Sequence, residues 1–181
     1  MPIDRSPLAP LYQASAVMAG VALVAIAVLM IGETLLRKFL GGYIPGASQL
    51  IAWSCCAAAF LAMPYAFRRG DFVRVDLAAA WLPLPGRRAA EVLSLLLMLG
   101  FCGFAAVATA RYAWAAARDE EMTQGMLELP LWWPQLSMVL GLALLALAVA
   151  ECLLDVLRGR TAIYALHDQE RRAKLDFSDR I

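Results

Sequence analysis

The chain has little charge and almost no histidine, and both shortages limit what it can do. Of its 181 residues only 17% are charged, 62% are hydrophobic, and histidine occurs once, as His167. A soluble domain of this length needs more polar surface, so we expect lipid to surround most of the chain. Haem in a membrane helix bundle needs histidines within the helices, whereas His167 falls in a polar tail. A net charge of +1 indicates no nucleic-acid partner.

Motifs of catalysis and cofactor binding are missing as well. The sequence contains no phosphate-binding glycine loop, no nucleophile elbow and no metal-ligand spacing. The four cysteines, Cys55, Cys56, Cys102 and Cys152, all fall in or at the edge of apolar runs. A quinone-linked disulfide oxidase needs thiol pairs that an oxidising compartment can reach, so this placement disfavours one. We interpret the cysteines as small packing residues and predict neither enzyme activity nor a cofactor.

Four apolar runs without a charged residue dominate the sequence. They are Leu11–Gly32, Leu40–Phe67, Val92–Ala110 and Leu129–Ala150. About 20 apolar residues cross roughly 30 Å of hydrocarbon as a helix, so each run is long enough to span a membrane. We predict an all-α membrane protein, a single membrane domain over residues 1–181. Its helices are expected at about 11–36, 47–67, 91–117 and 131–155, followed by a tail over 158–181.

Two alternatives to this interpretation concern the apolar runs. Four buried helices of a soluble protein would leave little polar face for water. A cleaved signal peptide is the alternative for the first run, because Arg5 precedes it. That run is longer than the apolar region of a signal peptide, so an uncleaved signal-anchor fits better.

Positive residues divide unequally between the two sides that four spans create. Of the sixteen Lys and Arg residues, twelve fall on the side of the termini and of the link between the second and third helices. Arg37, Lys38, Arg111 and Arg118 fall on the other side. Because positive residues near the membrane resist translocation, we predict that both termini are cytoplasmic.

The link between the second and third helices alternates charged and apolar residues. Asp76 is suited to cap a short helix that would end before Pro83 and Pro85. Trp81 and Leu82 would lie beside the lipid, which predicts a short interfacial helix along the cytoplasmic face. A plain solvated loop is the alternative.

Polar side chains within the predicted spans are few, which bears on transport. No charge falls near the middle of a span. Glu33 and Arg37 are one turn apart and predict a local ion pair at the headgroups, and Glu151 and Asp155 lie near Arg158 at the end of the fourth helix. A transporter that moves ions through its own body usually needs polar groups at the midplane, so we expect no translocation path in this chain alone.

The third helix carries a stripe of small residues at spacings of three and four. The stripe consists of Gly103, Ala106, Ala110, Ala113 and Ala117. Small residues on one face let another helix approach closely, as a docking surface would require. Because alanine is frequent throughout the sequence, a chance stripe is an equal alternative.

With these features in place, the chain resembles the small membrane subunit of the tripartite ATP-independent periplasmic (TRAP) transporters, the DctQ family, over roughly Leu11–Gly159. The most specific similarity is the run from Arg68 to Asp76 followed by Leu82-Pro83, and Leu129-Pro130-Leu131-Trp132 adds to it. The chain departs from the family where Phe72 replaces a frequent histidine. It departs again where Ser48 and Gln49 replace frequent acidic residues.

The resemblance implies a scaffold with partners rather than a complete transporter. It implies a large multi-helix permease subunit (DctM-like) that carries the sodium and substrate sites. It also implies a periplasmic solute-binding protein (DctP-like) that captures an organic acid, and a place in the bacterial inner membrane. The alternatives are a self-contained small transporter and an assembly subunit of another membrane complex. The candidate partner contacts are Arg68, Arg69, Asp71, Arg74, Asp76, Trp81, Gly103, Ala106 and Ala110.

Overall fold

Four long helices make up the part of the chain that the structure, a computed structural model, describes, residues 8–70 and 84–158. They are α1 (Ala9–Leu40), α2 (Ala47–Arg69), α4 (Leu84–Arg118) and α5 (Trp132–Leu157). Each is long and apolar enough to cross a membrane. The prediction of an all-α protein with four spanning helices is therefore confirmed. The predicted interfacial helix and the tail lie outside the described residues.

The ends of the helices differ from the predicted ones for local reasons. Helix α1 continues to Leu40 and ends at Gly41, whose φ of 64° is a left-handed conformation that suits glycine at a helix end. Helix α4 begins at Leu84, seven residues before the predicted start. Pro85 does not prevent this, because proline is tolerated in the first turn of a helix, where its missing N–H has no partner to lose.

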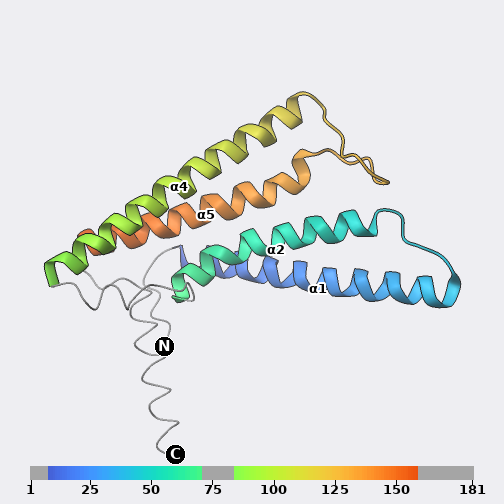
Figure 1. Cartoon of the computed structure of the whole chain (residues 1–181), viewed down its shortest axis with the longest axis horizontal. Helices are drawn as coiled ribbons and strands as arrows, with labels where there is room; N and C mark the ends of the chain where they lie inside the picture. The colour runs from blue at the N-terminus through green and yellow to red at the C-terminus, as the bar shows by residue number, and fades with distance from the viewer. Residues whose placement is uncertain (1–7, 71–83, 159–181) are drawn as a thin grey trace, which may run out of the picture.

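The four helices form two antiparallel hairpins that lie side by side. Helix α1 packs on α2 and α4 packs on α5, and the two hairpins meet through α2 and α5. Figure 1 shows the resulting order α1, α2, α5, α4, with the two hairpin turns at one end. We call this the hairpin end, and we call the opposite end, where α1 begins and α5 finishes, the terminal end.

The buried core lies mainly in the terminal half of this bundle. Its members come from all four helices, namely Tyr12, Phe67, Leu95, Cys102, Leu145, Ala148, Val149, Cys152 and Leu153. The last buried residue of α1 is Ala19, and the first of α5 is Gly141. Toward the hairpin end the two hairpins diverge (Figure 1). The packing that joins them is therefore strongest at the terminal end.

Polar residues on the helices mark two planes that match the thickness of a membrane. On each helix about 20 residues without Asp, Glu, Lys or Arg separate the two planes, which corresponds to about 30 Å. The pairs that bound these intervals are Tyr12 and Glu33, Gln49 and Arg68, Glu91 and Arg111, and Trp132 and Glu151. Helices α2 and α5 begin near the plane of the hairpin end, whereas α1 and α4 continue about two turns beyond it.

Two smaller predictions are settled by the positions of side chains. Arg37 and Glu33 form an ion pair of 2.8 Å, so that prediction is confirmed. Cys102 and Cys152 are buried in the core, as small packing residues should be. Cys55 is exposed on α2, so the packing role predicted for it is wrong.

Candidate functional site

Three polar side chains from three helices meet at the terminal end. The Tyr12 hydroxyl of α1 donates a hydrogen bond of 3.3 Å to Glu151 Oε2 of α5. The guanidinium of Arg68, in α2, donates from Nη1 to the same oxygen at 3.2 Å and lies 4.5 Å from the centre of the Tyr12 ring. We call Tyr12, Arg68 and Glu151 the polar clamp, because it joins both hairpins at one point.

Burial makes the polar clamp different from an ion pair on the surface. The side chain of Arg68 is only 7% exposed, that of Glu151 is 23% exposed, and Tyr12 is almost completely buried. Charges withdrawn from water depend on their partners, so loss of one partner leaves the other without compensation. The ring beneath the guanidinium adds a cation–π attraction of about 1 to 2 kcal/mol at such a desolvated position.

The sequence did not predict the polar clamp. Spacing along the chain placed Glu151 near Arg158, one to two turns away on the same helix. In the structure Glu151 contacts Arg68 across the interface between α2 and α5, 83 residues apart in sequence. No signal within the α5 sequence points to that partner, because it depends on which hairpin lies next to which.

The polar clamp lies next to the segment that the sequence singled out as a partner contact. Helix α2 ends at Gly70, whose φ of 76° turns the chain away two residues after Arg68. Arg69 is exposed, and its guanidinium lies 4.8 Å from the centre of the Tyr65 ring. Asp71, Arg74, Asp76 and Trp81 lie outside the described residues. Arg68 thus contributes to internal packing, one residue before α2 ends at Arg69.

The small residues of α4 lie along the border of its contact with α5. Ala113 is buried, whereas Gly103, Ala106 and Ala110 are half-buried. A Cβ atom added to Gly103 would meet nothing within 4 Å. Part of the stripe is therefore used inside the chain, and open space remains beside Gly103.

The backbones of the two hairpins approach each other closely at Gly141. A Cβ atom at this buried position of α5 would collide with the backbone carbonyl of Phe60 in α2. Only glycine lets the two helix backbones come this near, and the contact lies about midway along both helices. Gly141 thus determines how closely the two hairpins pack.

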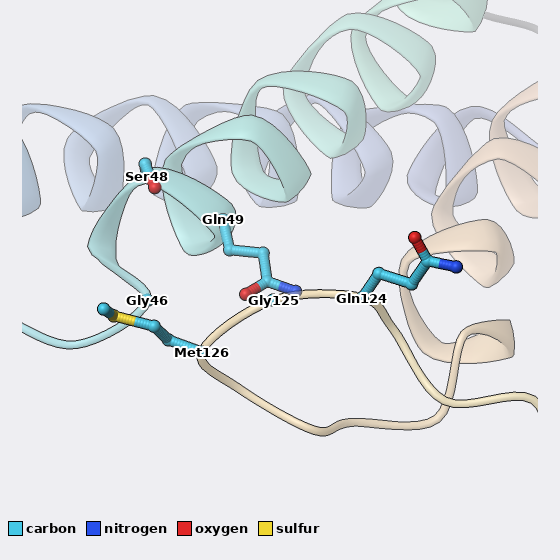
Figure 2. Close-up of a pocket in the computed structure, with 6 residues that line it drawn as sticks. All are labelled: Gly46, Ser48, Gln49, Gln124, Gly125 and Met126. Carbon is cyan, nitrogen blue, oxygen red and sulfur yellow. The ribbon is translucent and has the colours of Figure 1, made fainter.

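A loop joins the hairpins again at the hairpin end. We call residues 119–131, between α4 and α5, the hairpin-end loop. Figure 2 shows Gln49 reaching from the first turn of α2 to this loop at Gly125. The Gln49 amide donates from Nε2 to the Leu127 carbonyl and accepts from the Leu127 N–H, both at 3.4 Å. An open cavity of about 260 Å³ lies beside the contact, lined by Gly46, Ser48, Gln49, Gln124, Gly125 and Met126.

The contacts described above join parts of the chain to one another. Among residues 8–70 and 84–158 no group of three His, Cys, Asp or Glu side chains could hold a metal ion. The polar clamp, the Gly141 contact and the Gln49 contact each bind one helical hairpin to the other. The most specific contacts among the described residues are therefore those between the two hairpins.

These features define a multi-pass membrane protein in which the polar clamp and the Gln49 contact join the two hairpins. Comparison with known families identifies it further. The family model "Tripartite ATP-independent periplasmic transporters, DctQ component" matches residues 26–159, well over half of the chain. The chain belongs to this family of transporter components. No curated protein matches the sequence closely enough to count as a relative.

Proposed function

We propose that this chain is the scaffold subunit of a TRAP-type secondary transporter that imports an organic acid. In this proposal a large DctM-like permease subunit carries the ion-coupled translocation path, and a DctP-like periplasmic protein delivers the solute. The family match and the four long apolar helices support this assignment. The observation that carries it is the family match over residues 26–159, and the lack of a charged residue between the two planes of the described helices fits a subunit without a translocation path of its own.

We place the terminal end in the cytoplasm of a bacterium and the chain in its inner membrane. Twelve of the sixteen Lys and Arg residues fall on that side, which supports the orientation. The hairpin-end loop would then face the periplasm, on the side of the solute-binding protein. The proposal leaves no catalytic role and no cofactor for this chain.

We assign the contact with the large subunit to two surfaces. One is the segment that follows the end of α2 at Gly70, next to the polar clamp. Its candidate contact residues are Arg69, Asp71, Arg74, Asp76 and Trp81. The other is the border of α4 with Gly103, Ala106 and Ala110, where the open space beside Gly103 would admit a further helix.

Charge reversal in the segment after α2 tests this assignment. Arg74→Glu and Asp76→Arg, made singly, should reduce the amount of large subunit that co-purifies with the chain by several-fold. The amount of chain inserted in the membrane should stay unchanged, because both positions fall between the end of α2 at Arg69 and the start of α4 at Leu84. Arg118→Glu, an exposed reversal at the hairpin end, is the matched control. Normal recovery of the large subunit with both variants would contradict the role of this segment.

A further inference from the structure

The hairpin-end loop is well bonded within its own hairpin. The Thr123 N–H donates to the Leu129 carbonyl at 2.8 Å, and the Leu131 N–H donates to the Glu121 carbonyl at 2.9 Å. The Thr123 hydroxyl donates to the Leu127 carbonyl at 2.7 Å. The Glu121 N–H donates back to Ala116 at the end of α4. Distances of this kind are typical of firm hydrogen bonds, so the loop behaves as one body with α4 and α5.

The hydrogen bonds between this loop and the other hairpin are longer than those within the loop. Both hydrogen bonds from Gln49 to Leu127 measure 3.4 Å, about 0.4 to 0.5 Å longer than is usual for N–H to oxygen bonds. Beside them Leu127 packs over Gly46, where an added Cβ would collide with its side chain. The contact borders the open cavity, and Gln49 also packs against Gly125, where an added Cβ would collide with the Gln49 amide.

At the terminal half, in contrast, the two hairpins are packed tightly. The Phe60–Gly141 contact, the buried side chains Leu145 and Val149, and the polar clamp all lie on that side of the midpoint or at it. From Gly141 to the terminal end the two hairpins are thus joined by buried side chains, whereas at the hairpin end they are joined through the contacts of Leu127 and Gly125 with Gly46 and Gln49.

We propose that the hairpin-end loop is a releasable latch: it separates reversibly from α2, and the contact between Gln49 and Leu127 holds it in place. When the Gln49 contact breaks, the two hairpins part at the hairpin end and pivot near Gly141, while the polar clamp keeps the terminal end closed. Release frees the Leu127 N–H and uncovers the first turn of α2. This inference rests on the contacts within the chain and does not depend on the proposed transport function.

The experiment measures two distances in the full chain, purified and placed in lipid nanodiscs. Spin labels at Leu40 and Arg118 report on the hairpin end, and labels at Leu11 and Leu154 report on the terminal end; all four positions are exposed. The background carries Cys55→Ala and Cys56→Ala and keeps the buried Cys102 and Cys152. Gln49→Ala should lengthen and broaden the distance at the hairpin end and leave the terminal distance unchanged. Amide exchange at Leu127 should become roughly tenfold faster.

A matched control is available in the same cavity. Gln124→Ala makes the same chemical change, and Figure 2 shows the Gln124 side chain pointing away from Gln49. This variant should behave as the unmodified chain does. Gln49→Glu keeps an acceptor for the Leu127 N–H but loses the donor to the Leu127 carbonyl, so it should give an intermediate effect.

Three results would overturn the latch. The first is that both distances stay as they are in Gln49→Ala, and the second is that both change to the same extent, which would mean general loosening of the bundle. The third is that Gln124→Ala has the same effect as Gln49→Ala. If Gln49→Ala does not fold, Gln49→Glu provides the same comparison with a smaller change.

Discussion

Replacing Glu151 with alanine is expected to lower the free energy of unfolding by about 3 kcal/mol. The reason is that removal of one partner from a buried ion pair leaves an uncompensated charge, here the guanidinium of Arg68 at 7% exposure. The Tyr12 hydroxyl loses its acceptor at the same time. Both hairpins are held by this carboxylate, so the loss weakens their association and not one helix alone.

Thermal unfolding of the purified chain in detergent measures this effect. Glu33→Ala is the matched control, because it also removes a glutamate that pairs with an arginine. That pair is local to α1 and its arginine is 71% exposed, so its contribution should be about 0.5 kcal/mol or less. Equal losses from Glu151→Ala and Glu33→Ala would show that the polar clamp does not hold the hairpins together.

Replacing Gly141 with alanine is expected to be the most damaging single-methyl change among the glycines of the described helices. The new Cβ would meet the carbonyl of Phe60, which is backbone and cannot rotate away. Overpacking of this kind typically costs about 1 to 3 kcal/mol, and here it would also separate α2 from α5. The thermal midpoint should therefore fall clearly below that of the unmodified chain.

Gly100→Ala provides the control for this prediction. Gly100 lies on an exposed face of α4, and a Cβ there would meet nothing within 4 Å. Alanine favours a helix over glycine by about 0.5 to 1 kcal/mol, so this variant should be neutral or slightly more stable. A midpoint for Gly141→Ala equal to that for Gly100→Ala would rule out the close approach of α2 and α5.

The number and type of the helices could be predicted because each depends on sequence within a single run. Apolar runs such as Leu11–Gly32 contain the whole signal for a spanning helix. The start of α4 could not be predicted, since Pro83 and Pro85 are compatible with the end of one helix or the first turn of the next. The Glu33–Arg37 pair was predictable for the same reason as the helices, because both partners lie one turn apart.

The polar clamp and the Gly141 contact depend on how the hairpins pack, and the sequence has no local signal for the clamp. Arg68 was singled out for its place in a charged segment, but its partner Glu151 lies on a helix of the other hairpin. Gly141 follows Ser137 by four residues, a spacing of small residues that permits close helix packing and that the sequence prediction did not use. Arg68 was thus assigned another role, and Gly141 was not singled out at all.

Gln49 is an instructive intermediate case. In the sequence it differs from the acidic residues that are frequent in the family, and the sequence alone offers no physical reason for the difference. In the structure its amide both donates to and accepts from the backbone of Leu127. A carboxylate at this position could make only the accepting half of the contact. The departure therefore matches the contact that this particular chain makes with its hairpin-end loop.

The most direct test of the account as a whole is purification of the tagged chain from its native membrane in mild detergent, with mass spectrometry of what remains bound. A scaffold subunit should bring with it one large multi-span membrane protein in nearly equal amount. Recovery of the chain alone, or only with further copies of itself, would contradict the proposed function.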